Sequence, residues 1–304
     1  MNCLVVSYGS IGKRHAAILH QLGCEVNLVT TQEIYEFVCY QNIKEALHKK
    51  KFDYVVIANP THLHFSSIVE LISCEFTGIV LVEKPLFANL KQLPTHQFKQ
   101  LVVGYNLRFH ALLSRTKQLI ENETLVTFTA YVGQYLPTWR KNSDYRECYS
   151  AKKEYGGGVL RDLSHELDYS LWFCGSSYHV TANGGHFSEL EINSDDVYSI
   201  MMSCEACPIV NLHLNYLDRQ TRRDILINTQ TKTIFIDLIK GTLSINGKVA
   251  IQVAEATAKS YMYQHQAVLE NQFDTFCSYA EGIERMKLIT AAEKAANQKI
   301  WISL

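Results

Sequence analysis

Two titratable residues, Lys84 and His165, stand where a reaction could take place. Lys84 closes the segment Gly-Ile-Val-Leu-Val-Glu-Lys-Pro at residues 78–85, where an apolar run ends in a lysine and a proline. An apolar run of this kind is typical of a strand buried on both faces of a parallel sheet, and such sheets bind ligands at the carboxyl ends of their strands. The sequence therefore predicts a site at Lys84, with a surface lysine at the start of a loop as the alternative.

The second residue, His165, follows three glycines at residues 156–158. A helix over Gly157–Trp172 would place Asp162 and His165, three residues apart, on one face, and the glycine turn can bring backbone close to a ligand. Imidazole titrates near neutral pH, so His165 suits a general acid or base, and Asp162 could orient it. A purely structural histidine is the alternative. Asp168 would either hold the imidazole from behind or serve packing.

The first hundred residues alternate short apolar strands with helical patterns, which is typical of a parallel α/β sheet. Strands are expected at Cys3–Ser7, Glu25–Val29, Phe37–Cys39, Tyr54–Ala58, Ile79–Val82 and Leu101–Gly104, and helices at Gly12–Leu22, Ile43–Lys50 and His64–Ser73. The interval Leu86–Lys99 is short and polar and has room only for a brief helix.

A glycine turn follows the first strand, with the sequence Ser7-Tyr8-Gly9-Ser10-Ile11-Gly12. It nearly matches the G-x-G-x-x-G fingerprint of dinucleotide-binding folds, in which glycines let the backbone approach a pyrophosphate at a helix N-terminus. Ser7 replaces the first glycine, which weakens the motif but keeps the amides of residues 9–12. The position of the turn at the head of a strand and helix series predicts a nicotinamide dinucleotide site.

The second strand ends in Thr30-Thr31-Gln32, where NAD-binding folds usually carry an acid that holds the adenine ribose. The missing acid, with Lys13 and Arg14 near the phosphates, tilts the expectation slightly from NAD toward NADP.

From residue 111 the pattern changes to a helix at Ala111–Glu121 and then to long alternating segments of a mostly antiparallel sheet. These strands are expected at Leu125–Leu136, Tyr178–Phe187, Val197–Cys204, Ile209–Leu217, Asp224–Asn228, Thr233–Ile236 and Thr242–Ile245. Turn signals at Gly241 and Asn246-Gly247 support the last of them. Helices at Tyr263–Tyr279 and Met286–Ile300 would close the chain.

Composition limits the possible partners. The 304 residues carry a formal net charge of −1, and 47% are hydrophobic, so no overall field favours nucleic acid or an anionic membrane. The sequence has no apolar run long enough to span a bilayer and no secretory signal, so we expect a cytoplasmic protein. The nine cysteines lack disulfide spacing and are expected as thiols, and we expect no metal at Cys204 and Cys207.

Taken together, the motifs resemble the glucose-fructose oxidoreductase / inositol dehydrogenase / MocA (Gfo/Idh/MocA) family of NAD(P)-dependent oxidoreductases. The resemblance covers nearly the whole chain. Its marks are the glycine turn, Ala58-Asn59-Pro60-Thr61 with His64, Glu83-Lys84-Pro85, Tyr105-Asn106-Leu107-Arg108-Phe109, and Gly156-Gly157-Gly158 followed by Asp162, His165 and Asp168. Most family members space this aspartate and histidine four apart rather than three, which puts the role of Asp162 in doubt.

The resemblance implies a Rossmann domain at residues 1–110 and an α/β domain at residues 111–304, whose final helix, 286–300, returns toward the first. It implies a homodimer or homotetramer formed through the large open sheet. It also implies hydride transfer between nicotinamide and a hydroxyl or carbonyl carbon of a sugar, sugar acid or cyclitol.

The expected site residues fall into three groups. Lys84, His165 and Asp162 would be catalytic. The cofactor would meet Gly9, Ser10, Ile11, Gly12, Arg14, Thr30, Thr31, Asn59, Pro60, His64, Glu83 and Lys84. The substrate would meet Tyr105, Asn106, Arg108, Arg140, Tyr149, Asp162 and His165.

An aromatic and basic segment at residues 134–150 bears on the substrate. Guanidinium groups such as Arg140 favour carboxylates or phosphates, and rings such as Tyr149 suit sugar faces, so an anionic sugar is one interpretation. The segment also resembles a family branch associated with nonulosonate and surface-polysaccharide synthesis. Alternatives are a reductase of a non-sugar carbonyl or conjugated double bond, a catalytically silent dinucleotide-binding sensor, and, for each arginine, a packing role.

Overall fold

The computed structural model describes residues 1–140, 143–254 and 256–304. It divides into two compact units, with unit 1 formed by Met1–Asn106 and Tyr261–Ile283 and unit 2 by Leu107–Ser260 and Glu284–Leu304. The division differs from the expected single second domain at 111–304. The reason is that β15 (Cys277–Ser278) pairs antiparallel with β6 (Gln100–Val103), which places this later segment in the sheet of unit 1.

Unit 1 is built on a seven-stranded sheet of order β15-β6-β5-β4-β1-β2-β3, parallel except at β15. Its remaining strands are β1 (Asn2–Val6), β2 (Glu25–Val29), β3 (Val38–Tyr40), β4 (Tyr54–Ile57) and β5 (Ile79–Val82). All four residues of β4 and of β5 are buried, as their apolar sequences predict. The expected strands and the doubly wound parallel sheet are confirmed, with ends shifted by one residue at most.

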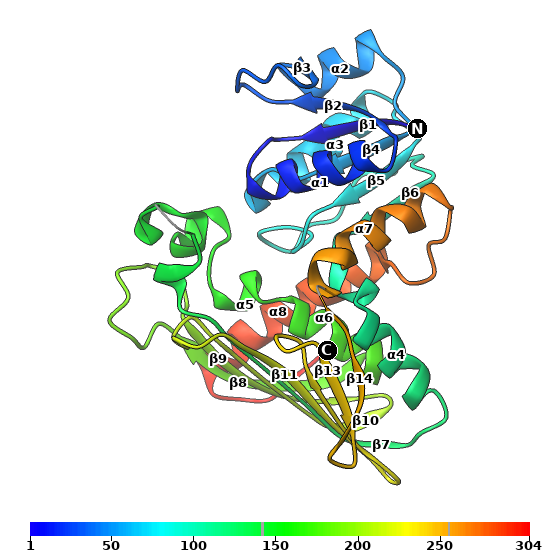
Figure 1. Cartoon of the computed structure of the whole chain (residues 1–304). Coiled ribbons are helices and arrows are strands. Elements are labelled where there is room, and N and C mark those ends of the chain that lie inside the picture. Colours follow the sequence, from blue (N-terminus) through cyan, green and yellow to red (C-terminus); the bar gives the residue numbers. More distant parts are fainter. Residues whose placement is uncertain (141–142, 255) are drawn as a thin grey trace. The chain divides into compact units, whose positions relative to one another are not determined.

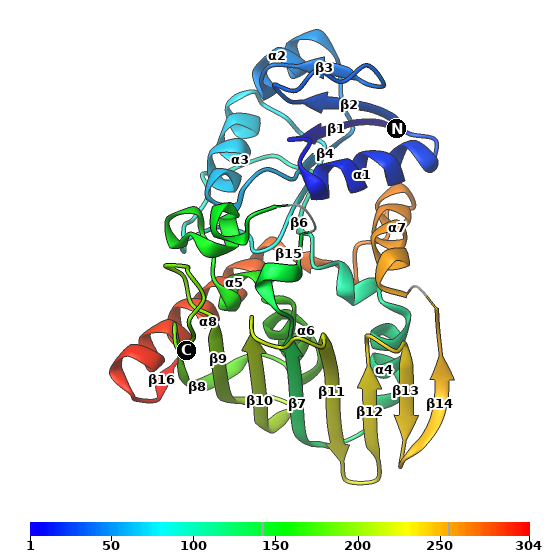
Figure 2. The same cartoon turned by 60° about the vertical axis from the view of Figure 1, so that its left-hand side comes forward.

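The helices of this sheet are α1 (Ser10–Gln21), α2 (Ile43–Lys49), α3 (His64–Ser73) and α7 (Ala256–Leu269), the last of which begins before the unit boundary. Strand order reverses between β1 and β4, and right-handed crossovers then put α1 and α3 on opposite faces, as Figures 1 and 2 show. This reversal point is where open α/β sheets bind ligands.

The chain departs from expectation near its end. The predicted helix Tyr263–Tyr279 is confirmed as far as Leu269 and wrong beyond it, because α7 stops there, Asn271 takes a left-handed conformation (φ 54°), and Cys277–Ser278 form a strand. The last helix, α8 (Tyr279–Gln298), starts earlier than predicted. Its residues from Glu284 onward group with unit 2. The interval Leu86–Lys99, all of it described, contains no helix.

Unit 2 contains a nine-stranded sheet of order β14-β13-β12-β11-β7-β10-β9-β8-β16, antiparallel except for the pair β7 and β10. The strands are β7 (Leu125–Gly133), β8 (Ser177–Gly185), β9 (Val197–Cys204), β10 (Cys207–Asn215), β11 (Arg222–Thr229), β12 (Thr233–Asp237), β13 (Thr242–Ile245), β14 (Lys248–Gln252) and β16 (Ile302–Ser303). The expected open, mostly antiparallel sheet is confirmed. The strands β14 and β16 were not predicted, because they are short edge strands, and β14 is mostly exposed.

One face of this sheet carries helices and the other carries none among the residues described (Figure 2). Along β9 buried residues alternate with more exposed ones, as a sheet covered on one side requires. The helices on the covered face include α4 (Ala111–Ile120), α5 (Val159–Asp162), α6 (His165–Cys174) and α8.

The predicted helix Gly157–Trp172 is broken into α5 and α6. Between them the backbone bonds change from the i−4 to the i−3 pattern, with Ser164 donating to Arg161 and Glu166 donating to Leu163. Asp162 ends one helix and His165 begins the next. The expectation that these two residues share one helical face is therefore wrong.

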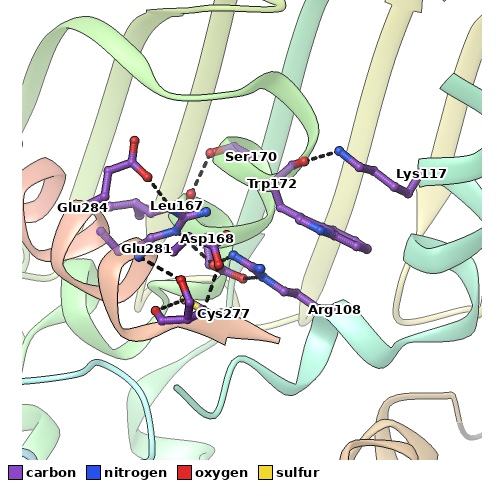
Figure 3. Close-up of polar contacts among 11 residues, drawn as sticks. Arg108, Lys117, Leu167, Asp168, Ser170, Trp172, Cys277, Glu281 and Glu284 are labelled. Carbon is purple, nitrogen blue, oxygen red and sulfur yellow. Dashed lines mark hydrogen bonds and ion pairs between the residues drawn. The ribbon is translucent and has the colours of Figure 1, made fainter. Parts of the chain in front are cut away.

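A buried ion-pair cluster joins three segments of unit 2 (Figure 3). Asp168 on α6 accepts two hydrogen bonds from Arg108, at 2.9 and 2.7 Å, and a third from Nε of Arg285 at 3.1 Å. All three side chains are at most 2% exposed. Arg108 and Arg285 each lie two residues beyond a crossing of the chain into unit 2, so Asp168 anchors both entering segments on α6.

The described residues show no site for a metal and no membrane span. All nine cysteines are free thiols, and six of them are buried, as expected. No group of metal-binding side chains gathers among the residues the structure describes. Within the same residues, none of the helices has both the length and the apolar character needed to cross a bilayer.

Replacing Asp168 with asparagine should destabilise the protein strongly, because it removes the carboxylate that pairs with the buried guanidinium group of Arg108 and leaves Arg285 with Glu284 as its acidic partner. We expect a loss of about 3–5 kcal/mol in the free energy of unfolding, measured by urea titration. The control is Glu147→Gln, which removes an exposed ion pair with Lys152 and should change stability by less than about 0.5 kcal/mol. Equal effects of the two substitutions would contradict this account.

Candidate active site

The carboxyl ends of the parallel strands in unit 1 gather most of the predicted cofactor residues. The glycine turn follows β1, Thr30 follows β2, Asn59 and Pro60 follow β4, and Lys84 follows β5. Because these strands are parallel and adjacent, all of these segments lie along one edge of the sheet, at the reversal of strand order. The predicted placement of these segments along one edge is confirmed, and their contact with a cofactor stays a prediction.

The glycine turn has the geometry of an anion site. A side chain at Gly12 would place its Cβ 2.1 Å from the carbonyl oxygen of Ser7, so glycine is required there. A side chain at Gly9 would meet nothing within 4 Å, which leaves open space over the turn. Helix α1 begins with neither a side-chain cap nor an acid in its first turn, so its amides face outward for a phosphate group.

Ser7 keeps the conformation of the glycine it replaces. Its φ is 82°, in the left-handed region where a side chain costs about 1–2 kcal/mol. The turn is therefore preserved at the expense of local strain.

The end of β2 carries hydroxyl and amide groups instead of an acid. The Thr30 hydroxyl accepts from the backbone of Gln32 at 3.1 Å, and the Gln32 side chain donates to the Tyr8 carbonyl at 3.5 Å. The Lys13 ammonium lies 5.4 Å from the centre of the Tyr8 ring, while Arg14 stacks on Tyr261 at 4.9 Å. Lys13 therefore lies against the ring of Tyr8, whose carbonyl group accepts a hydrogen bond from Gln32 just beyond β2.

His64 lies in the interior rather than at the edge. It is 1% exposed, and its two ring nitrogens face the carbonyl oxygens of Asn59 at 3.0 Å and of Pro85 and Leu86 at 3.1 and 3.2 Å. Burial lowers its pKa, although the carbonyl contacts act in the opposite direction. The predicted cofactor contact is corrected to a positioning role, because the ring holds together the loops that carry Asn59 and Lys84.

Glu83 is likewise turned inward. Its carboxylate lies 2.9 Å from Nε2 of His15 on α1, and both side chains are buried. Burial opposes ionisation of Glu83, but the hydrogen bond with His15 and the nearby charges outweigh it and lower the pKa of the carboxyl. The predicted direct cofactor contact of Glu83 is corrected accordingly. His15 was missed, although its place three residues after Gly12 was a usable signal.

Lys84 itself is half-buried, and its backbone amide donates to the second oxygen of Glu83 at 3.2 Å. It therefore has both the strand-end position and the neighbouring carboxylate that distinguish it from an ordinary surface lysine.

In unit 2, Asp162 is held by tyrosines. The Tyr216 hydroxyl donates to its carboxylate at 2.6 Å, and Tyr149 forms a further hydrogen bond with it. Burial and the adjacent Asp162 raise the pKa of both phenols well above the usual value, which keeps them as donors. Tyr216 was not predicted, because nothing in the sequence marks a residue just beyond β10 as a partner of α5.

The two glycines directly before α5 pack closely against other residues of the same unit. A Cβ at Gly157 would lie 2.1 Å from the carbonyl oxygen of Tyr149, and one at Gly158 would lie 2.3 Å from the carboxylate of Asp195. Asp195 accepts from the Leu160 amide at 2.9 Å, and burial raises its pKa to about 6. The expected close approach to a ligand at this turn is therefore replaced by internal packing.

His165 is the first residue of α6 and is 7% exposed. Tyr105 and Asn106 are also buried, at 1% and 2% exposed. Arg108 is corrected: its guanidinium is engaged by Asp168, so it serves packing rather than substrate binding. Asp168, in turn, holds arginines and not the imidazole.

In the aromatic and basic segment at residues 134–150, the guanidinium group of Arg140 lies over the ring that is hydrogen-bonded to Asp162. Arg140 is exposed and lies 5.4 Å from the centre of the Tyr149 ring, whose hydroxyl reaches Asp162. Arg146, by contrast, is neutralised by Asp144 and Glu191 at 2.7 and 2.9 Å. Lys141 and Asn142 of this segment lie outside the described residues.

A reversed parallel sheet with an uncapped glycine turn and a second unit with an open sheet define the class of two-domain dinucleotide-binding oxidoreductases. Two family models match the chain: the oxidoreductase family with NAD-binding Rossmann fold over residues 1–102, and the GFO/IDH/MocA C-terminal domain over residues 113–243. The chain belongs to the Gfo/Idh/MocA family.

Individual relatives are distant. An uncharacterized oxidoreductase of Synechocystis sp. is 26% identical over 151 residues, which span 47% of this chain and 40% of the relative. WlbA dehydrogenase from Bordetella pertussis, in complex with NADH and UDP-GlcNAcA, has a TM-score of 0.81 at 18% identity, over 100% of this chain and 97% of that one. Levoglucosan dehydrogenase, in complex with NADH and L-sorbose, has a TM-score of 0.82 at 14% identity, over 100% and 98%. These two structures share the fold of this chain.

The two glycines of the turn should respond differently to substitution by alanine. Gly9→Ala should change stability by less than about 1 kcal/mol, since its methyl meets only open space. It should weaken NADH and NADPH binding about tenfold, because the methyl occupies the approach of the pyrophosphate. Gly12→Ala should instead lower the free energy of unfolding by about 1–3 kcal/mol. Fluorescence titration and urea unfolding measure the two effects, and unchanged affinity in Gly9→Ala would remove the turn from the cofactor site.

Proposed function

We propose that this protein is an NAD(P)-dependent oxidoreductase that transfers a hydride between nicotinamide and a hydroxyl or carbonyl carbon of a sugar, sugar acid or cyclitol. One observation carries the proposal: an uncapped glycine turn and a lysine lie along the same carboxyl edge of the sheet in unit 1. Family membership and the fold shared with sugar dehydrogenases support it.

The bound dinucleotide would supply the hydride chemistry, and the chain's residues fit its phosphates at Gly9–Gly12. His165 takes the hydroxyl proton in oxidation and returns it in reduction. Lys84 stabilises the negative charge that develops on the substrate oxygen. Asp162, which is hydrogen-bonded to Tyr216 and Tyr149, orients polar groups around the reacting centre.

We infer that the substrate is anionic, in line with nonulosonate or surface-polysaccharide metabolism. Arg140 and the Tyr149 ring offer a guanidinium and an aromatic face beside Asp162, a combination suited to a sugar that carries a carboxylate or phosphate. WlbA, which shares the fold, is in complex with UDP-GlcNAcA.

The nucleotide preference should favour NADP. Thr30, Thr31 and Gln32 carry no acid that would repel a 2′-phosphate, and Lys13 lies at Tyr8 beside them. In the titrations above, wild-type protein should bind NADPH more tightly than NADH, and the reverse order would contradict this preference.

A second candidate is a catalytically silent dinucleotide-binding sensor, which the strained Ser7 and the missing acid after β2 favour. It predicts tight NAD(P)H binding and no turnover with sugar acids or with aromatic carbonyls. A reductase of non-sugar carbonyls would turn over the aromatic carbonyls but not the sugar acids.

Substitutions at Lys84 and His165 test the enzyme directly. Lys84→Ala and His165→Ala should keep NAD(P)H binding but lose at least about a hundredfold in turnover, because each removes a group needed at the reacting oxygen. The assay is nucleotide absorbance against a panel of sugars, sugar acids and cyclitols. Full turnover in both variants would remove these residues from the mechanism.

We also propose that the chain forms a homodimer or homotetramer through the uncovered face of the sheet in unit 2. Met201 on β9, Leu226 on β11 and Phe235 on β12 are 44%, 37% and 39% exposed on that face. A hollow of about 450 Å³ lies among β7, β8, β9 and β10, lined by side chains that include Tyr131, Asn183 and His213. Exposed apolar side chains on a continuous, helix-free sheet favour burial against a second copy.

Introducing charge on this face should break the assembly. Met201→Glu combined with Leu226→Glu should convert the oligomer to monomer in light scattering, since two carboxylates would have to be buried in each copy. Tyr35→Glu, at a 95% exposed position in unit 1, is the control and should not change the mass. A monomeric wild type, or an unaffected double variant, would refute the interface.

A further inference from the structure

Four buried side chains of unit 1 form an unbroken hydrogen-bonded line from the middle of the sheet to the residue before Lys84. Tyr54 on β4 lies 3.1 Å from Nδ1 of His265 on α7, and Nε2 of His265 lies 2.7 Å from Nδ1 of His15 on α1. Nε2 of His15 lies 2.9 Å from Glu83. The first three side chains are fully buried and Glu83 is 6% exposed. One strand and two helices thus contribute side chains to a line that ends at one carboxylate.

Ionised Glu83 fixes the direction of this line. With His15 in its neutral form, the Tyr54 hydroxyl donates to His265, the Nε2 hydrogen of His265 donates to His15, and the Nε2 hydrogen of His15 donates to Glu83. Each ring nitrogen on the line then has one partner. Burial lowers the pKa of His265 well below its usual value and raises that of Tyr54, which keeps both neutral. Tyr54 and His265 are therefore neutral members of the line, which ends at the carboxylate of Glu83.

The position of that charge is set by packing as well. A Cβ at Gly104 would lie 3.1 Å from the carboxylate oxygen of Glu83 and 3.3 Å from its Cα, so Glu83 rests against a residue without a side chain. Its other oxygen accepts from the backbone amide of Lys84 at 3.2 Å. The titratable groups that act on Glu83 are His15 and Lys84, and Glu83 in turn acts on His64 and Tyr54.

We propose that the Tyr54–His265–His15–Glu83 line positions Lys84 and keeps a negative charge beside it, and that His15 and His265 are positioning residues for the reaction. His265 and Tyr54 hold His15 in the tautomer that donates to Glu83, and that donation keeps the buried carboxylate ionised. The inference rests on the proposed function insofar as it assigns Lys84 to the reacting oxygen.

The line also links the two parts of the cofactor edge. His15 lies on the helix that begins at the glycine turn, and Glu83 directly precedes Lys84. Without the His15 donor, a carboxylate buried in this place would take up a proton, and Lys84 would lose its neighbouring negative charge.

The reactivity of the Lys84 amine tests this chemistry without a substrate. Full-length variants are reductively methylated over a range of pH, and the labelling of the Lys84 peptide is followed by mass spectrometry. In Glu83→Gln and in His15→Leu the midpoint for Lys84 should fall, because the carboxylate that precedes it in the chain loses its charge. His15→Gln supplies an amide donor and should restore most of the wild-type midpoint.

Internal and matched controls separate this effect from general damage. Lys13 is exposed on the same helix as His15, and its labelling midpoint should not move in any variant. Tyr54→Phe removes only the last hydroxyl and should produce a smaller shift. If His15→Leu does not fold, the near-isosteric Glu83→Gln decides. An unchanged Lys84 midpoint in folded Glu83→Gln would overturn the proposal.

The labelling experiment on Lys84 and the turnover assay of the proposed function can fail independently of each other. A shifted Lys84 midpoint in a protein that turns over none of the sugar panel would keep the positioning line and reject the sugar oxidoreductase. Sugar turnover with an unshifted midpoint in Glu83→Gln would keep the enzyme and reject the line.

Discussion

The buried carboxylate of Asp168 is the interaction on which unit 2 most depends. A carboxylate removed from water must receive hydrogen bonds and an opposite charge, and Asp168 obtains both from Arg108 and Arg285. These arginines belong to two segments that are far apart in the sequence and that enter unit 2 separately. Helix α6, which begins with His165, is therefore fixed at the point where both segments arrive.

The same rule governs two further buried acids, Asp162 and Glu83. Asp162 is satisfied by tyrosine hydroxyls and Glu83 by an imidazole, so each acid has a different kind of donor. Arginine gives a fixed charge pair, tyrosine gives neutral donors, and histidine gives a donor that depends on its own tautomer. Of the three, only Glu83 thereby depends on the protonation of a neighbouring side chain.

Much of the fold could be predicted from the sequence, because the evidence was local. The strands β2, β5, β9 and β13 have the expected bounds, since apolar runs and turn residues fix them. The glycine turn was also predictable, and the φ of Ser7 shows that the backbone kept the conformation even where the residue changed. The break between α5 and α6 was not, because each segment alone is compatible with one continuous helix.

Site residues were predicted less well because their roles depend on contacts across the sequence. Arg108 has the composition of a ligand-binding residue, and only its burial against Asp168 shows otherwise. Tyr216 and His265 carry no local signal, since their partners Asp162 and His15 lie 54 and 250 residues away. The strand-end position of Lys84 was predictable because its evidence, an apolar run ending in a charge, is contained within eight residues, and the role of Lys84 in the reaction stays a prediction.

The pairing of His15 with His265 has a consequence for the order in which the protein can form on the ribosome. The two residues are separated by 250 positions, and bacterial and eukaryotic ribosomes add roughly 5–20 residues each second. His15 and Glu83 therefore leave the ribosome about 10 to 50 seconds before the helix that completes their hydrogen bonds. During that interval the nascent Rossmann sheet has an open edge at β6 and an unfinished interior, and residues Leu107–Ser260 of unit 2 are synthesised before unit 1 can close.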